Sequence, residues 1–427
     1  YGTMNLRVLT FLCLLFPCLV FAQKKVKPKM FVYGSDITAL SAAIQAARSN
    51  VPTVMLMDKP ILAEEITSEV LQIEGNKNLD GGIWMGILME MAISKTRDDS
   101  LAQVVKKDFN PQLARNAIDK YMRELPNLTV IKEQSIAKVT RNKRNWEIVL
   151  SNRQKFEVLS VVDASENAGL LKASGLKLDS TVQGSFTKAK DMGLAISRTT
   201  LAVGELDNAS SVVFLKDLLA FEKENLFDIG RLRTLAKSPD NIGFRSSFGQ
   251  AIGATAGYTA FFKTDSKKID IRKLQAELLA FKARLIPYQD VEIKDPHFGA
   301  IQKCYLTGVF LGKEVEGKYI FDGNQVVKFS DVKAVLNDIY TRSQLWFLDN
   351  YREDELTWKD LLGMIKFISF KGDEVDRQIA KDWKTKLKFE GEFSPENKVT
   401  RDQFAVVADL FSSSFAKAIN LDGSFVK

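Results

Sequence analysis

The stretch Lys29 to Asn50, KMFVYGSDITALSAAIQAARSN, constrains the fold more than any other part of the sequence. It opens with an apolar run that ends at Gly34, and apolar residues then recur at helical spacing from Ile37 to Ala47. A second apolar run, VPTVMLMD, ends at Asp58. Strand, glycine turn, helix and strand in this order predict a βαβ unit, whose two strands lie parallel in one sheet.

The turn of this unit, GSDITA, leaves two interpretations open. A nucleotide-binding turn needs glycine where the pyrophosphate approaches the helix N-terminus, and Ala39 is acceptable at the last position. Ser35 or Asp36 can instead cap the helix with its own side chain, and a carboxylate at Asp36 would oppose a phosphate. The turn therefore predicts either a cofactor site that includes Gly34, Ser35 and Ala39, or a structural βαβ unit without a ligand.

Asp58, at the end of the second predicted strand, favours the cofactor site. It stands 24 residues after Gly34, where a carboxylate can accept hydrogen bonds from the ribose of an adenosine. The competing interpretation is a surface carboxylate, because aspartate is common at strand ends.

Further along the chain, the pattern predicts more strands and two tightly packed regions. Residues 128–165 hold several short alternating runs separated by NKRN and SNRQ, which predict an antiparallel meander. The last run, FEVLSVVDAS, is continuously apolar and is expected to return to a covered sheet. A helix is predicted over Val212–Glu224, and the small-residue-rich segment Arg245–Lys263 predicts a helix that packs very closely on a neighbour.

Four segments together resemble the secreted or periplasmic FAD-dependent oxidoreductases that are common in bacterial carbohydrate-degrading loci. In order along the chain they are Phe31–Pro60, Phe156–Gly175, Phe244–Lys263 and Ile269–Ile286. The resemblance implies an α/β, FAD/NAD(P)-binding three-layer fold with a central parallel sheet and an antiparallel meander over residues 23–290. It also implies FAD as the cofactor.

The resemblance assigns further cofactor-binding residues in the second and third segments. In FEVLSVVDASENAGLLKASG, Asp163 and Ala164 match the family's second flavin-side motif. In FRSSFGQAIGATAGYTAFFK, Gly249, Gln250 and Gly253 are in register with the family's glycine-rich helix. Glycines at a helix N-terminus would let backbone amides meet the flavin, whereas tight helix packing would also require small residues here.

The sequence departs from the family pattern in ways that bear on activity. The opening glycine pair is reduced to one, and Glu166 and Asn167 replace a glycine-acid pair. The region near 170–240, which would form the substrate domain, is short. No catalytic residue is assigned.

Residues 291–427 are expected to form a helical domain that resembles S-layer-homology repeats. Phe393–Phe411 resembles the second half of such a repeat, Asp295–Lys313 the first half, and Phe321–Tyr340 a degenerate second half. We expect structural support from this domain more than wall binding. The single histidine, His297, is expected to make a structural contact at a helix start.

The first 22 residues predict a signal peptide with a few residues upstream of it. Met4 begins a short basic segment, the following apolar run is interrupted by Pro17, and the small residues Val20 and Ala22 predict cleavage after Ala22. We therefore expect a secreted or periplasmic protein without a transmembrane span after cleavage.

Composition excludes several kinds of chemistry. Cleavage would leave one cysteine, Cys304, beside the single histidine, so thiol pairs, histidine-rich metal sites and most Ser or Cys triads are excluded. No metal site is predicted. The net charge of +7 is spread along the chain without interleaved aromatics, which indicates solvated surface and favours a cell-surface or glycan partner over nucleic acid.

Taken together, the export signal and the family resemblance predict an exported FAD-dependent oxidoreductase-like protein whose substrate, a small molecule or a carbohydrate-related glycan, is not identified. The alternatives are a catalytically degenerate flavoprotein-fold scaffold and a cell-surface or glycan-binding protein.

Overall fold

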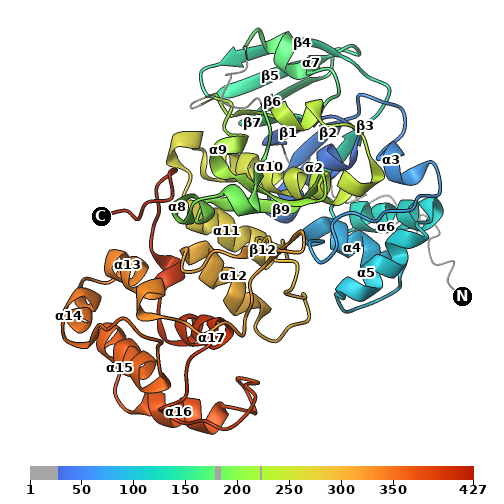
Figure 1. Ribbon diagram of the computed structural model, residues 1–427. Coiled ribbons are helices and arrows are strands. Elements are labelled where there is room, and N and C mark those ends of the chain that lie inside the picture. Colours follow the sequence, from blue (N-terminus) through green and yellow to red (C-terminus); the bar gives the residue numbers. More distant parts are fainter. Residues whose placement is uncertain (1–26, 178–183, 222–223) are drawn as a thin grey trace, which may run out of the picture.

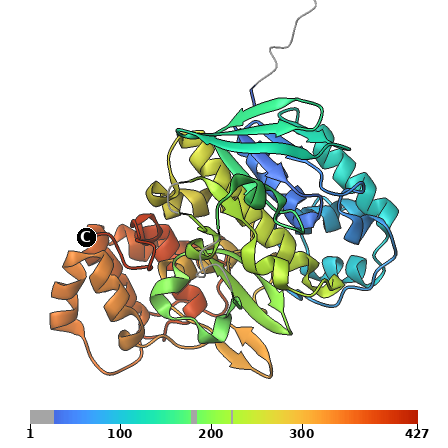
Figure 2. The same cartoon turned by 90° about the horizontal axis from the view of Figure 1, so that it is seen from above.

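The structure, a computed structural model, describes residues 27–177, 184–221 and 224–427. The predicted signal peptide and its cleavage site lie outside the described residues. The α/β region lies above a helical C-terminal region in Figure 1, and Figure 2 shows the orange and red C-terminal helices to one side of the central sheet.

The centre of the α/β region is a five-stranded parallel sheet with the order β11-β7-β1-β2-β3. Its strands are β1 (Met30–Tyr33), β2 (Thr53–Leu56), β3 (Leu128–Ile131), β7 (Ser160–Asp163) and β11 (Leu226–Asp228). Strand β1 lies between β2 and β7, with Tyr33 beside Leu56 and Asp163. The predicted βαβ unit is confirmed, with α2 (Ile37–Arg48) as its crossover helix.

Alternate side chains of the sheet enter two separate apolar layers. Met30, Val32 and Met55 point to the layer that contains α2 and the long helix α10 (Ile242–Phe262). Phe31 and Val54 point to the opposite layer, against the meander. That meander consists of β4 (Ile136–Asn142), β5 (Asn145–Leu150) and β6 (Lys155–Val158). Helices, parallel sheet and antiparallel meander form the predicted three-layer fold, which is therefore confirmed.

A cluster of helices follows the second strand of the sheet. They are α3 (Glu64–Thr67), α4 (Gly82–Met91), α5 (Asp99–Lys107) and α6 (Pro111–Arg123). A fully buried ion pair lies between α5 and the segment before α4. Lys106 Nζ lies 2.5 Å from one Asp80 carboxyl oxygen, and the other Asp80 oxygen accepts a hydrogen bond from Asn76 (2.8 Å). This network fixes α5 against the segment that leads into α4.

The region near 170–240 contains a small antiparallel sheet. Its order is β8-β10-β9, with β8 (Thr187–Lys188), β9 (Thr200–Leu206) and β10 (Ala209–Phe214). The short helices nearby are α7 (Gly169–Ser174), η2 (Ala189–Asp191), α8 (Leu194–Ser197), α9 (Leu215–Leu218), η3 (Gly230–Thr234) and η4 (Pro239–Asn241).

The predicted helix over Val212–Glu224 is wrong. Val212 and Val213 belong to β10 and pair with Val203 and Ala202 of β9, and of the described residues in this range only the four of α9 are helical. Pairing with β9 and burial of two β-branched side chains override the helical spacing of the local sequence.

The C-terminal region begins after η5 (Ser266–Lys268) and α11 (Ile271–Ala280). Its elements are α12 (Phe298–Thr307), the hairpin β12 (Lys313–Val315) and β13 (Lys318–Ile320), α13 (Phe329–Ile339), α14 (Thr341–Asn350), α15 (Trp358–Ser369), α16 (Glu374–Asp382), α17 (Arg401–Phe411) and η6 (Ser414–Ala416). The apolar core continues without interruption from the α2 layer into these helices. The boundary between 23–290 and 291–427 stays a prediction.

Three backbone segments close a ring at the centre of the C-terminal helices. Val327 N donates to Val399 O (2.9 Å), Val399 N donates to Leu356 O (2.9 Å), and Leu356 N donates to Val327 O (2.8 Å). Helices α13, α15 and α17 each begin two residues after one member of this ring. The three units are therefore structurally equivalent, and the sequence pattern had indicated only the first and the last.

His297 precedes α12 and is buried between two other C-terminal segments. Its Nδ1 lies 2.5 Å from Asp402 Oδ2, and its Nε2 lies 2.6 Å from the carbonyl oxygen of Leu387. Burial alone would lower the pKa of His297, but the hydrogen bonds to Asp402 and to the Leu387 carbonyl raise it above the ordinary value. The expected structural contact at a helix start is present.

The raised pKa of His297 gives a pH-dependent stability. A histidine whose pKa is higher in the folded state stabilises the fold fully below its unfolded pKa of about 6.5, and this contribution is lost as pH rises through the folded pKa. The free energy of unfolding should therefore fall between pH 6 and pH 9 more steeply in the wild type than in His297→Gln. Urea unfolding across this range measures both slopes, and equal slopes would contradict the assignment.

Among the described residues, no helix is both long and apolar enough to cross a membrane.

Candidate functional site

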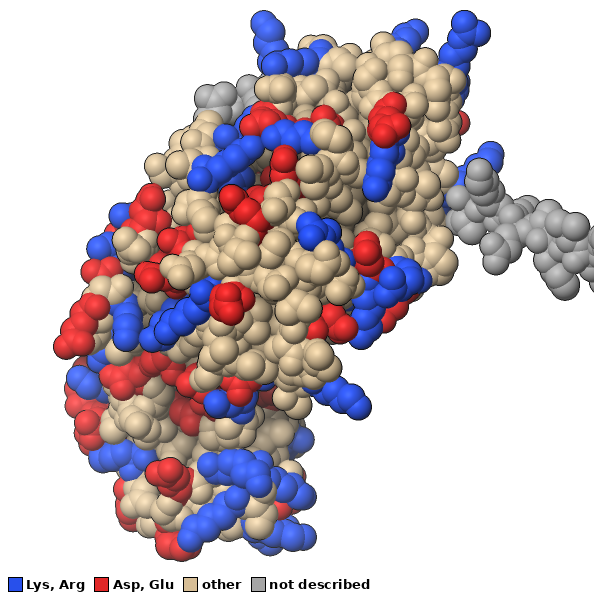
Figure 3. Space-filling model, turned by 90° about the vertical axis from the view of Figure 1, so that its right-hand side faces the viewer, with Lys and Arg blue, Asp and Glu red and all other residues tan. Residues whose placement is uncertain are grey.

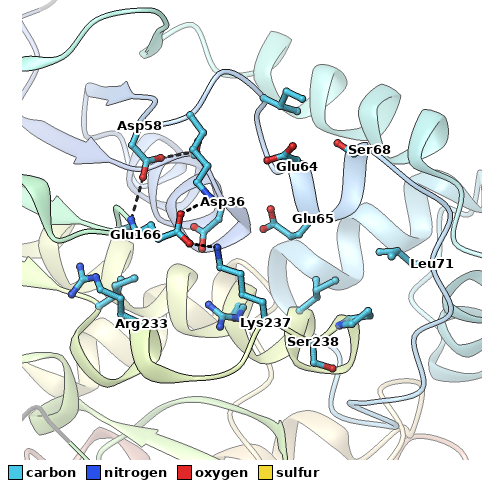
Figure 4. Close-up of a pocket in the computed structure, with 18 of the residues that line it drawn as sticks. Asp36, Asp58, Glu64, Glu65, Ser68, Leu71, Glu166, Arg233, Lys237 and Ser238 are labelled. Atoms are coloured by element: carbon cyan, nitrogen blue, oxygen red, sulfur yellow. Dashed lines mark hydrogen bonds and ion pairs between the residues drawn. The ribbon is translucent and has the colours of Figure 1, made fainter.

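A cavity of about 600 Å³ lies at the carboxyl edge of the central sheet. Ligands of open α/β folds bind at this edge, where the loops that follow the strands converge. The cavity wall combines the β1–α2 turn, the segment after β2 with α3, the turn after β7, and the segment from η3 into α10 (Figure 4). Its volume falls within the range of ordinary small-molecule sites.

Two carboxyl groups hold the start of α2 on one side of this cavity. Asp36 Oδ1 accepts a hydrogen bond from Ala39 N (3.0 Å), so Asp36 caps its own helix. Glu65 Oε1, from α3, accepts a hydrogen bond from Ile37 N (2.5 Å). Both amides lie in the first turn of α2, so the two acids together occupy the N-terminal end of one helix.

Both acids have a raised pKa. Burial raises the pKa of Asp36, against the effect of its bond to the Ala39 amide and of the Arg245 guanidinium. Burial and then the neighbouring Asp36 charge raise the pKa of Glu65 to about 7. At neutral pH, this pair therefore carries less negative charge than two free carboxylates would.

Four cationic side chains complete the wall, and three of them are paired with acids. Arg233 Nη1 and Nη2 each lie 2.9 Å from an Asp228 oxygen, and this guanidinium is mostly buried. Lys59 and Lys237 both lie 2.6 Å from Glu166, whose pKa their hydrogen bonds and charges lower to about 2. Three of the four cations are thus held in ion pairs, and the six acidic side chains of the wall outnumber its four basic ones.

Arg245 of α10 is the fourth cation and faces the acid pair. Its Nε donates to Asn241 Oδ1 (3.0 Å), and its Nη2 donates to the carbonyl oxygen of Leu235 (3.1 Å). Burial lowers the pKa of Arg245, while the Asp36 and Glu65 charges oppose that effect.

Figure 3 shows that acidic and basic side chains also alternate over one outer face of the molecule.

Three of the predicted site residues line the cavity: Ser35, Asp58 and Ala164. Asp58 Oδ1 accepts a hydrogen bond from Ser35 Oγ (2.6 Å), and Asp58 Oδ2 accepts one from Glu166 N (3.1 Å). Asp58 therefore joins the β1–α2 turn to the turn after β7 and holds its carboxylate in one orientation at the cavity wall.

Three other predicted residues do not line the cavity but determine the conformation of the turns that form its wall. Gly34 has φ of +147°, and a Cβ there would lie 2.8 Å from the Ala164 carbonyl oxygen, so only glycine suits this turn. Ala39 packs in the same turn, 2.9 Å from that Cβ position. Asp163 is buried and accepts hydrogen bonds from Ser165 N (3.0 Å) and Leu171 N (2.7 Å), which shapes the turn after β7.

The remaining three predicted residues do not lie at a helix N-terminus, and that part of the prediction is wrong. Helix α10 begins at Ile242, so Gly249 and Gly253 lie in its interior. A Cβ at either glycine would lie 2.3 Å from a carbonyl oxygen of α2. Gln250 Oε1 accepts a hydrogen bond from Ile83 N (3.1 Å), and its Nε2 donates to Gln45 (2.9 Å). These residues fasten α10 to α2 and α4.

Sequence reasoning missed Glu65, Arg233 and Arg245 as members of the site. Glu65 is in a four-residue helix that carries no pattern, and the two arginines reach the cavity only through the fold. Among the described residues, no group of three or more histidine, cysteine or acidic side chains could hold a metal ion.

Residues 30–217, which are less than half of the chain, match the family model of FAD dependent oxidoreductases. No curated protein matches the chain. The family match supports FAD-dependent oxidoreductase ancestry for this part of the chain, and with it the prediction of FAD as the cofactor.

Solved structures that the chain resembles include a thioredoxin reductase, a monooxygenase and a tetracycline destructase. A thioredoxin reductase of Lactococcus lactis is 12% identical, with 33% of this chain and 35% of that chain covered and a TM-score of 0.22. The p-nitrophenol 4-monooxygenase of Pseudomonas putida is 12% identical, with 36% and 45% covered and a TM-score of 0.23. The tetracycline destructase Tet(51) is 12% identical, with 39% and 44% covered and a TM-score of 0.25. The chain thus spans less than half of each protein, and TM-scores this low give no support for a shared function.

The residues around the cavity fit one end of FAD and oppose another part of it. Asp58 stands at the cavity wall in the position from which a carboxylate can accept bonds from a ribose. The start of α2 does not fit a diphosphate while Asp36 and Glu65 are ionised. Both acids occupy amides there, and their charges would repel the phosphates.

Proposed function

We propose that this chain is an exported FAD-dependent oxidoreductase that holds the adenosine end of FAD in the cavity beside Asp58. The observation that carries the proposal is the place of this cavity. It lies between the β1–α2 turn and the turn after β7, and both of these turns belong to the segment that matches the oxidoreductase family model, whereas the wall from Ile229 to Arg245 lies outside that segment. A carbohydrate-related substrate is proposed on the sequence resemblance alone.

The chain's own residues would bind and orient the cofactor. Asp58 would accept hydrogen bonds from ribose hydroxyls, since Ser35 and the Glu166 amide hold its carboxylate in place. Arg245 would stand beside the diphosphate, next to the first turn of α2. FAD supplies the redox chemistry when bound, and the protein supplies position and electrostatics.

A second candidate function is a binding or scaffold protein that keeps the flavoprotein fold without flavin. The observation that favours it is the pair of acids that occupies the first turn of α2. Association with a cell surface or glycan through residues 291–427 belongs to this candidate, and binding of the full chain to isolated cell-wall polymer would support it.

The test is a calorimetric titration of the mature protein with FAD at pH 6, with Asp58→Asn as the site variant. We expect Asp58→Asn to weaken FAD binding about tenfold or more, because hydrogen bonds to a charged group contribute roughly 1.5–3 kcal/mol. Asp119→Asn, on the exposed face of α6, is the matched control and should bind as the wild type does. A wild type that takes up no FAD would leave only the scaffold candidate, and equal affinities of all three proteins would remove Asp58 from the site.

A further inference from the structure

The first turn of α2 is held by acids from two different parts of the chain. Asp36 bonds to the Ala39 amide from within the turn, and Glu65 bonds to the Ile37 amide from α3. A helix N-terminus with free amides is a ready site for phosphate, since its N–H groups and dipole both favour negative charge. Here, the two carboxyl groups already satisfy amides that a diphosphate would use.

The groups that surround the acid pair come from every neighbouring element. Arg245 of α10 and Arg233 of η3 act on Asp36 from the cationic side, and Asp58 after β2 acts on it from the acidic side. Arg245 also acts on Glu65. The other charged groups of the cavity wall are Lys59, Glu64, Glu69, Glu166 and Lys237. Lys59 and Lys237 are both paired with Glu166. Arg245 donates to neutral oxygens and takes part in none of the described ion pairs of the wall, so it is the cation that is left to act on Asp36 and Glu65.

We propose that Asp36 and Glu65 determine whether the cavity accepts a diphosphate. As carboxylates, they hold the α2 amides and exclude the diphosphate. As neutral acids, they no longer exclude it. This inference rests on the proposed function. It deepens that proposal by naming the residues that set the discrimination between a phosphate-bearing ligand and the bare nucleoside.

The direction of the pH dependence follows from the geometry and agrees with the raised pKa of both acids. Protonation removes the negative charge that opposes the diphosphate and weakens the hydrogen bonds that the two carboxyl groups accept from the amides. The pKa of Glu65 is raised to about 7 by burial and by Asp36, so this change takes place near neutral pH. Affinity for FAD should therefore be high below pH 7 and fall as pH rises above it, whereas affinity for adenosine should stay constant.

Calorimetric titrations with FAD and with adenosine at pH 5.5 and pH 8.5 test the proposal. The diphosphate of FAD is a diester and keeps its charge across this range, so a change in affinity reports the protein. The key variant is Asp36→Asn with Glu65→Gln, which keeps both hydrogen-bond acceptors for the α2 amides and removes both charges. The matched control is Glu64→Gln, on the same short helix and in the same wall but without a bond to α2.

For the wild type and Glu64→Gln, we expect FAD to bind about tenfold more weakly at pH 8.5 than at pH 5.5, as expected for a linkage of roughly one pKa unit. Adenosine should change by less than about twofold on this scale. The double variant should bind FAD equally well at both pH values. FAD binding by the double variant alone would contradict the release of the block at pH 5.5 and would leave only the scaffold candidate for the wild type.

A wild type with equal FAD affinity at both pH values would overturn the inference and leave the proposed function standing. A pH dependence of FAD affinity that persists in the double variant would also overturn the inference and leave the proposed function standing. Failure of the wild type and every variant to bind FAD or adenosine would overturn both the inference and the proposed function. Binding of adenosine with no binding of FAD by any variant would overturn the inference, because the charges would not be the cause.

Discussion

Replacing Gly253 with valine is expected to lower the free energy of unfolding by about 3 kcal/mol or more, which is at the upper end of overpacking effects. A Cβ at this position would lie 2.3 Å from the carbonyl oxygen of Ala42 and 2.6 Å from its Cα. Both atoms belong to the backbone of α2, which cannot yield as a flexible side chain can. Urea unfolding of the wild type and the variant measures the difference.

The matched control for this variant is Gly257→Ala, one turn further along the same face of α10. A Cβ at Gly257 would meet Ala46 at 3.7 Å, which is ordinary van der Waals contact. We expect this change to be neutral or to stabilise the protein by up to about 1 kcal/mol, because alanine is the better helix former. A Gly253→Val protein with wild-type stability would show that α10 does not approach α2 as closely as the structure places it.

The second large effect is expected from Lys106→Met, which removes one partner of the buried pair with Asp80. Both side chains are 0% exposed, and the ammonium also donates to the Gly75 carbonyl oxygen (2.8 Å). Removing one partner of a buried pair leaves an uncompensated charge and costs roughly 3–5 kcal/mol. The free energy of unfolding from urea titration measures this cost.

Lys120→Met is the matched control for the buried pair. Lys120 forms an ion pair with Glu90 at 2.8 Å, but both side chains are well exposed. Exposed pairs contribute little to stability, so this variant should unfold with the wild-type midpoint. Equal effects of the two lysine changes would contradict the assigned difference in burial.

The first half of the fold could be predicted because its signals are local. The apolar strands, the single glycine at the turn and the helical spacing from Ile37 onward lie within one continuous stretch, and the structure has the expected parallel pair β1 and β2. Gly34 could be predicted for the same reason, since its φ of +147° is a property of the turn itself.

The role of the α10 glycines could not be decided from the sequence. A glycine that opens a helix toward a ligand and one that lets two helices touch look alike in one dimension. Only the position of α2 against Gly249 and Gly253 distinguishes the two roles. The β10 strand is a similar case, because β9 supplies the pairing that its own sequence does not reveal.

Glu65, Arg233 and Arg245 could not be predicted as members of the candidate site from the sequence, and the reason is physical. Asp36 and Asp58 flank recognisable elements, whereas Glu65 reaches the Ile37 amide from a four-residue helix 28 residues away in the sequence. Arg245 is brought to the same place by a helix more than 200 residues downstream of Asp36. Such convergence depends on the tertiary fold and carries no local pattern.

The most direct test of the central claim is a crystal structure of the mature protein grown with FAD at pH 5.5. The account predicts an adenosine ribose within hydrogen-bond distance of the Asp58 carboxylate and a diphosphate at the first turn of α2, beside Arg245. Electron density for FAD elsewhere on the protein, or an empty cavity with Asp36 and Glu65 still bonded to the α2 amides, would contradict it.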